Sequence, residues 1–263
     1  MKASETLKIT IITVCKNSEQ FLSETIESVK NQSYQNIEYI VIDGRSVDNT
    51  IPIIKHYSSH ISLWKSEEDI GMYDAINKGL RLATGDYILI LNSDDVLATN
   101  DTIKNVVEQM ITETFDYYYG NMIKLKKGKL KKVKLFPVTY KQLLLSTHGT
   151  FVPHPCFFVS VKLDKILAGY NLAYRYAADY DYILRALANI DCKGKFINVD
   201  ITKFRIHNSS ITASGKIHKE RIKILHKNKY YRIPYLTRLG SYYILWIYYK
   251  IINVLHFYKA DKG

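Results

Sequence analysis

Two adjacent carboxylates, Asp94 and Asp95, come shortly after an apolar run at residues 87–91, from which Asn92 and Ser93 separate them. An apolar run of this length, ended by polar residues, is typical of a buried strand. Carboxylates at the end of such a strand need a partner, because an unpaired buried charge is strongly destabilising. Two interpretations are open at this point: the pair binds a cation, or it caps a helix that follows, which is a frequent use of Asp.

Two further carboxylates, Asp43 and Asp69, also come at or shortly after predicted strands. The carboxyl ends of parallel strands lie at one edge of a sheet, so we expect these groups to converge there. Oxygen ligands without thiolates favour Mg²⁺ or Mn²⁺, and Mg²⁺ sites use one or two carboxylates while phosphate and water complete the coordination. The pattern therefore predicts a divalent metal ion that holds a diphosphate.

Several other site classes are disfavoured by the sequence. Neither G-x-G-x-x-G nor G-x-x-x-x-G-K-[ST] occurs, which argues against a dinucleotide-binding enzyme and a P-loop ATPase. Cys15, Cys156 and Cys192 form no C-x-x-C pair, so we expect reduced thiols rather than disulfides or a zinc site. The N-terminal residues turn polar after one strand's length, which predicts no secretory signal and a cytoplasmic protein.

The elements that must position these residues alternate as a parallel α/β sheet requires. Strands are predicted from β-branched runs at residues 8–16, 36–43, 61–66 and 86–92. Helices are predicted from helical spacing at residues 18–32, 51–57 and 72–83. Ser18 is expected to cap the first helix, and Pro52 fits the first turn of the second. We expect a twisted, mostly parallel sheet with helices on both faces.

Beyond Asn100 the pattern is less regular. The sequence predicts helices at 102–112 and 178–190, and strands at 115–121, 154–160 and 194–207. A hairpin rich in lysine, at 123–135, is expected to turn at Lys127 and Gly128.

The net charge of +12 is concentrated at the C-terminal end of the 263-residue chain. Eleven of the 37 Lys and Arg, but only two of the 25 acidic residues, lie after residue 215, so this segment carries +9. We predict one domain at 1–214 and a basic, amphipathic helical tail at 215–263. The uncharged run at 239–249 is too short to span a bilayer, which takes about 20 residues. The tail either lies on an anionic membrane surface or packs on the domain or a second subunit.

Six motifs, in order, resemble those of the family 2 glycosyltransferases, which have the GT-A fold. They are "TIITVCKN", "IEYIVIDGRSVDNT", "EEDIGMYDAINKGLRLATGDYILILNSDD", "HPCFFV", "AADYDYILRAL" and "FRIHNSSIT", spread over residues 7–212. They are most similar to the branch that builds bacterial O-antigen, a part of lipopolysaccharide, and capsular polysaccharide. The resemblance implies a Rossmann-like GT-A fold and a nucleotide-sugar donor.

The resemblance also implies roles for individual residues. The donor-binding candidates are Thr13, Cys15, Asn17, Asp43, Asp69, Gly71, Asn77, Ser93 and Asp94. Asp43 matches a carboxylate that meets the uracil ring or ribose, which favours UDP. Ser93-Asp94-Asp95 matches the family's D-x-D position with Ser first, so Asp95 is implied as the ligand of Mn²⁺ or Mg²⁺. His207 matches a position that reaches the diphosphate or metal in relatives, although a lone His is also often structural.

Asp179 occupies the place of the family's catalytic base, and Ala178 replaces the Glu that usually precedes it. Asp181 is the alternative, and for either residue the helix dipole alone could explain an acid in the first turn. His154 either touches the acceptor or is a packed loop residue. One base without a carboxylate nucleophile implies a single displacement that inverts the anomeric configuration.

We therefore expect an inverting glycosyltransferase that moves a hexose or N-acetylhexosamine from a UDP-sugar to a polyprenyl-diphosphate-linked saccharide. It would work at the inner face of the cytoplasmic membrane, held there by its tail. An inactive sugar-nucleotide-binding protein of the same fold is the main alternative. A nucleic-acid-binding protein is disfavoured, because the basic excess lies in the tail and the sheet edge is acidic. The donor sugar, the acceptor and any homo-oligomer are left open.

Overall fold

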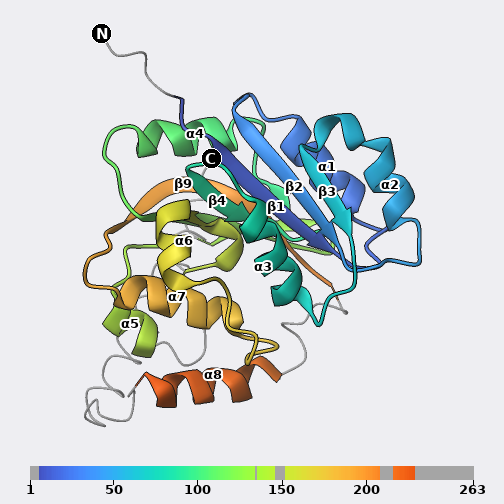
Figure 1. Ribbon diagram of the computed structural model, residues 1–263. Coiled ribbons are helices and arrows are strands. Elements are labelled where there is room, and N and C mark those ends of the chain that lie inside the picture. Colours follow the sequence, from blue (N-terminus) through green and yellow to red (C-terminus); the bar gives the residue numbers. More distant parts are fainter. Residues whose placement is uncertain (1–5, 134, 146–151, 208–215, 229–263) are drawn as a thin grey trace.

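The computed structural model describes residues 6–133, 135–145, 152–207 and 216–228. Its strands form one mixed sheet in the order β3-β2-β1-β4-β8-β6-β9-β5, and β7 pairs with β6. Helices cover both faces of this sheet (Figure 1). The predicted α/β class and the helices on both faces are therefore confirmed.

The first four strands are parallel, as predicted. They are β1 Ile9–Cys15, β2 Ile37–Asp43, β3 Leu63–Ser66 and β4 Tyr87–Ile90. The helical connections are α1 Leu22–Lys30, α2 Thr50–His56 with a short 3₁₀ turn Ser58–His60, and α3 Met72–Leu82. All residues of β1 and β4 are buried, which explains why these strands are apolar without alternation.

The remaining strands add antiparallel pairs. β8 Phe157–Ser160 runs antiparallel between β4 and β6 Tyr117–Lys126, and β9 Gly194–Ile206 is parallel to β6. β5 Val96–Leu97 pairs antiparallel with β9. Because β8 is antiparallel to both β4 and β6, strand β6 runs in the same direction as β4, and so does β9. The carboxyl end of β9 therefore lies at the same edge of the sheet as those of β1, β2 and β4.

Two apolar clusters occupy the two faces of the sheet. Alternate residues of β1 fall into different clusters, Ile12 into the one that includes α3 and α7 and Ile11 into the one that includes α1 and α4. The later helices are α4 Thr102–Met110, α5 Tyr140–Leu145, a 3₁₀ turn His154–Cys156, α6 Val161–Leu167, α7 Ala178–Ala188 and α8 Lys216–Lys227.

The predicted lysine hairpin is confirmed. β6 and β7 Lys129–Val133 are joined at Lys127 and Gly128, whose φ angles of 49° and 75° suit a tight two-residue turn. The strand predicted at 115–121 and the first arm of the hairpin form a single strand, β6. Likewise, the strands predicted at 194–207 form one strand, β9.

The predicted Ser18 cap is wrong. Helix α1 begins at Leu22, and the carbonyl of Ser18 accepts the backbone N–H groups of Phe21 and Leu22 in a turn before the helix. This turn directs the Ser18 hydroxyl to Ser93 Oγ, at 2.9 Å. Ser18 therefore joins the loop after β1 to the loop after β4.

Helix α8 is the described part of the predicted tail. Predictions for residues 229–263, including the apolar run at 239–249, lie outside the described residues. Among the helices of the described ranges, none is both long and apolar enough to cross a membrane.

Glu38 joins three chain segments at the edge of the sheet opposite the candidate site. Its carboxylate accepts hydrogen bonds from Lys8 Nζ at 3.0 Å, Thr10 Oγ1 at 2.7 Å and the backbone N–H of Thr84 at 2.8 Å. Burial raises the pKa of Glu38, but the hydrogen bonds from Thr84, Thr10 and Lys8 outweigh burial and bring the pKa down from 4.5 to about 2.

We expect Glu38→Gln to lower the free energy of unfolding by about 1 to 3 kcal/mol near neutral pH, because charge-assisted hydrogen bonds are lost. The folded-state pKa is depressed, so this contribution is complete above pH 4.5 and is lost as the pH falls towards about 2. Urea unfolding at a series of pH values should show the difference between wild type and variant shrinking over that range. Glu108→Gln, on an exposed face of α4, is the control; a Glu38 difference that does not change with pH would contradict the prediction.

Candidate active site

The candidate site lies at the edge of the sheet where β1, β2, β4 and β9 end (Figure 1). Asp94 and Asp95 follow β4 and His207 follows β9, so the common strand direction brings together residues that are 113 positions apart. The alternative that the two carboxylates cap a helix is wrong, because the next helix begins at Thr102 and is preceded by Asp101.

Asp94 and His207 face each other at this edge. Asp94 Oδ2 lies 2.8 Å from His207 Nε2, and their side chains are 29% and 26% exposed. The ring of Phe21 lies beside the imidazole, with the ring centroids 5.3 Å apart. A carboxylate and an imidazole that are both partly exposed can bind a cation together.

Asp95 lies beneath this pair and is completely buried. Its carboxylate accepts hydrogen bonds from the backbone N–H of Arg205 at 2.9 Å and from Asn92 Nδ2 at 3.3 Å. Burial, and then the nearby charge of Asp94, raises the pKa of Asp95 well above 3.8. Among the described residues, the buried Asn92 Oδ1 has no hydrogen-bond partner. This acceptor adds to the oxygen-rich character of the loop after β4.

Arg205 attaches the end of β9 to the loop after β4. Besides its backbone bond to Asp95, its Nε donates to the carbonyl of Asp94 at 3.0 Å and its guanidinium pairs with Glu24 at 2.5 Å. The guanidinium also lies over the ring of Phe21, 4.5 Å from the centroid. Arg205 was not among the predicted site residues, although its place two positions before His207 in "FRIH" was a usable signal.

The donor set of this edge fits a magnesium-like ion. Such an ion commonly takes one or two protein carboxylates and completes its coordination with phosphate and water. Throughout the described ranges, no group of three or more His, Cys, Asp or Glu side chains that could hold a metal ion is present. Asp94 and His207 supply two potential ligands, so an ion held here would take its remaining ligands from phosphate and water.

The end of β2 holds a second, buried carboxylate, Asp43. It accepts hydrogen bonds from the backbone N–H of Ser46 at 3.0 Å, from the Ser46 hydroxyl and from Ser66 Oγ at 2.6 Å. Cys15 Sγ lies 3.7 Å from Asp43 Oδ1. Burial, and next the charge of Asp43, raises the pKa of Cys15, which favours the protonated thiol.

Thr13 and Asn17 flank Cys15 differently. The buried Thr13 Oγ1 accepts a hydrogen bond from the Tyr39 hydroxyl at 3.1 Å. Asn17 has a left-handed backbone, with φ of 51°, and its Oδ1 accepts the N–H of Val47 at 3.0 Å. Asn17 N donates to Ser46 Oγ at 2.7 Å. Asn17 therefore joins the loops after β1 and β2, whereas Thr13 lies inside the sheet.

Asp69 and Gly71 lie in the loop between β3 and α3. Asp69 Oδ1 accepts the N–H of Gly71 at 2.9 Å, and Gly71 has φ of 142° immediately before α3. A Cβ on Gly44 would lie 2.1 Å from Asp69 Oδ2. The absence of a side chain on Gly44 therefore lets the loop after β2 approach the Asp69 carboxylate.

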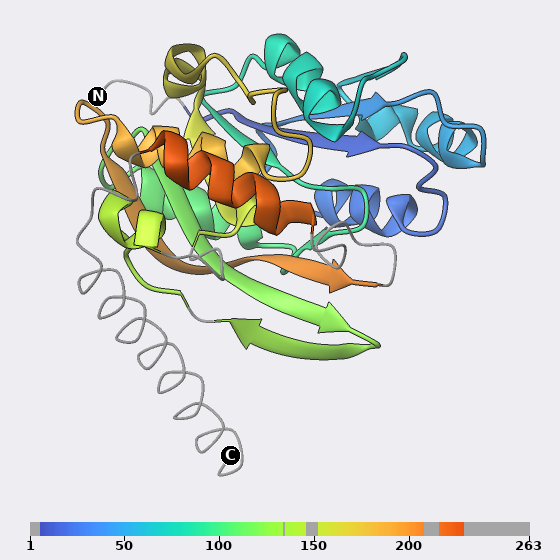
Figure 2. The ribbon, with the colours of Figure 1, turned by 90° about the horizontal axis from the view of Figure 1, so that it is seen from below.

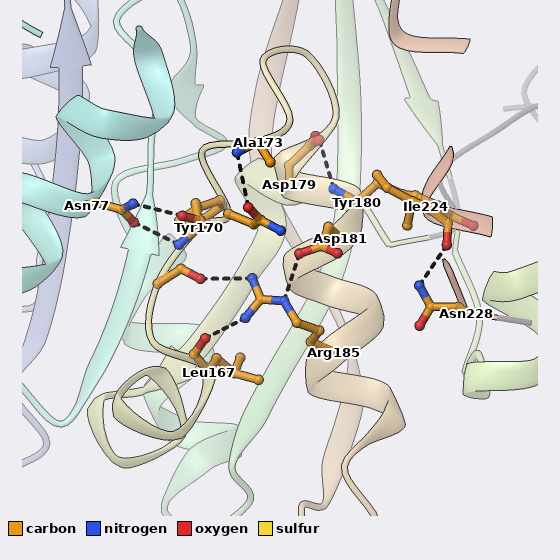
Figure 3. A network of polar contacts seen from close by, with 12 residues as sticks. Asn77, Leu167, Tyr170, Ala173, Asp179, Tyr180, Asp181, Arg185, Ile224 and Asn228 are labelled. Atoms are coloured by element: carbon orange, nitrogen blue, oxygen red, sulfur yellow. Dashed lines mark hydrogen bonds and ion pairs between the residues drawn. The ribbon is translucent and has the colours of Figure 1, made fainter. Parts of the chain in front are cut away.

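The side-chain amide of Asn77, on α3, forms two hydrogen bonds with the backbone of Tyr170 (Figure 3). Its Nδ2 donates to the carbonyl of Tyr170 at 2.9 Å, and its Oδ1 accepts the N–H of Tyr170 at 2.8 Å. In this arrangement Asn77 fixes the loop before α7 to α3. Its predicted place beside the donor stays a prediction.

Asp179 stands in the first turn of α7. Its carboxylate accepts hydrogen bonds from the Tyr73 hydroxyl at 3.1 Å and from the N–H of Tyr180 at 2.8 Å. Asp181 is 98% buried and paired with Arg185 Nε at 2.7 Å, and Arg185 also donates to the carbonyl of Leu167 (Figure 3). Of the two candidates, Asp179 is therefore the carboxylate available for a proton transfer.

A stack of tyrosine rings supports this carboxylate. Tyr73 stacks on Tyr170 with ring centroids 5.6 Å apart, and Tyr170 stacks on Tyr182 at 4.3 Å. His154 Nε2 lies 2.6 Å from the Tyr170 hydroxyl, and burial lowers the pKa of His154. His154 is thus a neutral, packed residue, as one of its two interpretations had it.

The chain matches the model of Glycosyl transferase family 2 over residues 10–167, which is more than half of its length. The protein therefore belongs to the family 2 glycosyltransferases.

Two relatives agree with this assignment. An uncharacterized glycosyltransferase of Mycobacterium tuberculosis is 30% identical over 184 residues, a match that covers 68% of each chain. A PGL/p-HBAD biosynthesis glycosyltransferase of Mycobacterium bovis is 27% identical over 234 residues, covering 88% of this chain and 85% of the relative. Neither name concerns O-antigen or capsule.

Two solved structures have the same architecture. Residues 1–349 of S. aureus TarS, in complex with UDP-GlcNAc, match with a TM-score of 0.70 and 17% identity. The match covers 83% of this chain, which spans 65% of that one. The mannosyltransferase PcManGT of Pyrobaculum calidifontis, in complex with GDP-Man and Mn²⁺, matches with a TM-score of 0.64 and 17% identity over 90% of this chain and 73% of the other. The expected GT-A fold is confirmed.

Proposed function

We propose that the protein transfers a hexose or N-acetylhexosamine from a UDP-sugar to a saccharide acceptor, with inversion at the anomeric carbon. The observation that carries the proposal is the Asp94 and His207 pair at the carboxyl edge of the sheet. A separate carboxylate, Asp179, is available at the start of α7. UDP is favoured by the place of Asp43 in the motif series and by the UDP-GlcNAc that TarS binds.

A divalent cation, Mn²⁺ or Mg²⁺, would relieve the negative charge that develops on the departing diphosphate. We assign it to Asp94 and His207, because both side chains are partly exposed and face each other. PcManGT, whose structure contains Mn²⁺, is consistent with such a cofactor. The motif-based candidate, Asp95, is buried beneath the pair, and its direct contact with the cation stays a prediction.

Matched Asp→Asn variants distinguish these two carboxylates. We expect Asp94→Asn to weaken Mn²⁺-dependent binding of UDP by at least about tenfold, because a ligand is lost. Asp95→Asn should keep that dependence, since its role would be to hold Arg205 and the loop. Calorimetric titration with UDP, with and without Mn²⁺, measures both effects. Loss of the Mn²⁺ dependence in Asp95→Asn alone would instead place the cation on Asp95.

Asp179 would act as the general base. The acceptor hydroxyl oxygen bonds to the anomeric carbon as the bond from that carbon to the diphosphate oxygen breaks, and Asp179 takes the hydroxyl proton. Burial, and next the charge of Asp179, raises the pKa of Tyr73 well above 10, so its hydroxyl stays a donor to Asp179. This hydrogen bond would orient the carboxylate without protonating it.

We expect Asp179→Asn to retain UDP-sugar binding and to lose transfer by about 10²- to 10⁴-fold, the usual contribution of a general base. Asp181→Asn, two residues along the same helix, should retain transfer and lower the free energy of unfolding, because it breaks a buried ion pair. Transfer to a panel of saccharides, with product linkage determined by NMR, measures both rate and inversion. Undiminished transfer by Asp179→Asn would remove the base assignment, and nucleotide binding without transfer by the wild type would favour an inactive binding protein.

We further propose a polyprenyl-diphosphate-linked acceptor of surface polysaccharide synthesis, O-antigen or capsule, used at the inner face of the cytoplasmic membrane. The lysine hairpin supports membrane contact. Lys124 faces Lys131 and Lys126 faces Lys129 across the two strands, an arrangement that is destabilising without an anion nearby. Leu130, between Lys129 and Lys131, is exposed. Lysines around an exposed leucine suit an anionic lipid surface, and the part of the basic tail that follows α8 would add to this contact.

The double variant Lys126→Glu/Lys129→Glu should bind vesicles that contain anionic lipid at least about tenfold more weakly, because each lysine near the surface contributes about 1 kcal/mol. Cosedimentation with neutral and with anionic vesicles at two salt concentrations measures this. Lys55→Glu/Lys104→Glu, exposed on α2 and α4, is the control and should bind as the wild type does. Unchanged vesicle binding by the hairpin variant would contradict the proposed membrane contact of the hairpin. No vesicle binding by the wild type would favour packing of the tail on the domain or a second subunit.

A further inference from the structure

Helix α8 lies beside α7, as the two views in Figures 1 and 2 show. Ile224 and Leu225 of α8 are buried in the apolar cluster that includes α7. The guanidinium of Arg221 lies over the ring of Tyr180, 4.9 Å from its centroid. The beginning of the basic tail is thus packed against the helix that carries Asp179.

Glu220, the sole acidic residue of α8, binds the chain immediately before α7. Its carboxylate accepts three consecutive backbone N–H groups: Arg175 at 2.9 Å, Tyr176 at 2.7 Å and Ala177 at 2.9 Å. Successive N–H groups that point to one position form a binding site for an anion, here filled by a side chain of the same protein. A carboxylate at this end of α7 is also favoured by the helix dipole.

These three N–H groups precede α7, whose first residue is Ala178, and Asp179 follows at once. The segment before them is held by its own turn, in which Asn171 accepts the N–H groups of Ala173 and Tyr174. Farther along, α7 is anchored by the Asp181 and Arg185 ion pair and by its buried face. Glu220 therefore acts on the entry into α7 rather than on the helix as a whole.

We propose that Glu220 is a positioning residue that sets the Asp179 carboxylate for proton transfer. The proposal rests on the proposed role of Asp179 as base. It makes α8 part of the catalytic unit, so that the boundary of the functional domain lies beyond α8 rather than before it.

The test compares Glu220→Ala, Glu220→Gln and the control Lys219→Ala, which changes an exposed residue of the same helix. Glu220→Ala should lower kcat by about tenfold to a hundredfold, the effect expected of a small displacement of a catalytic group, and leave UDP-sugar affinity unchanged. Glu220→Gln, which keeps one acceptor oxygen, should recover part of the rate. Lys219→Ala should behave as the wild type does.

Two further measurements separate positioning from a general structural effect. Amide hydrogen exchange at Arg175, Tyr176 and Ala177 should quicken in Glu220→Ala, which checks the contact independently of activity. Adding Glu220→Ala to Asp179→Asn should cause no further loss of transfer, because the group that it positions is already gone.

The outcomes are distinct. Three results would each overturn the positioning role. They are faster exchange with an unchanged kcat, a loss of UDP-sugar affinity as large as the loss of kcat, and a further loss of transfer of full size when Glu220→Ala is added to Asp179→Asn. Undiminished transfer by Asp179→Asn alone would instead overturn the base assignment. If Glu220→Ala does not fold, Glu220→Gln carries the same comparison.

Discussion

The common direction of β4 and β9 is the constraint on which the candidate site depends. Because two antiparallel pairings separate them in the sheet, both strands end at the same edge. The backbone N–H of Arg205 then donates to the Asp95 carboxylate, which joins the end of β9 to the loop after β4. Together with the bond from Arg205 Nε to the carbonyl of Asp94, it holds the end of β9, and with it His207, close to Asp94. Hydrogen bonds inside the protein thus contribute to a contact at its surface.

The two adjacent carboxylates have different surroundings for a physical reason. A charge in a low-dielectric interior is costly unless it is satisfied by donors, and the donors at this edge come from Asn92 and Arg205. They point to Asp95, which is buried, whereas Asp94 reaches solvent and the imidazole of His207. We interpret Asp95 as the residue that shapes the loop and Asp94 as the one that meets a ligand. A similar difference occurs on α7, where Asp181 is buried in an ion pair with Arg185 and Asp179 is partly exposed.

The support of Asp179 comes from elements that are remote in sequence. Tyr73 on α3 donates to it, stacked tyrosines lie beneath, and Asn77 holds the loop that leads into α7. Glu220 on α8 binds the segment immediately before α7, which is the basis of its proposed positioning role. A base that is positioned by rigid, packed neighbours can work without reorganising during the reaction. The tight packing around α7 is therefore as much a part of the candidate site as the carboxylate.

The local pattern of apolar and turn residues was enough to predict much of the fold. The continuous apolar runs of β1 and β4, the helical spacing of α3 and the Lys127-Gly128 turn each depend on neighbouring residues, so their elements follow from the sequence alone. The start of α1 did not follow from the local sequence, because a turn and a contact with Ser93 override the capping tendency of Ser18. Strand direction brought the predicted carboxylates to one edge, but their exposure was decided by donors far along the chain. Which of Asp94 and Asp95 is buried, and what Glu220 binds, depend on three-dimensional contacts, and only the tertiary structure determined them.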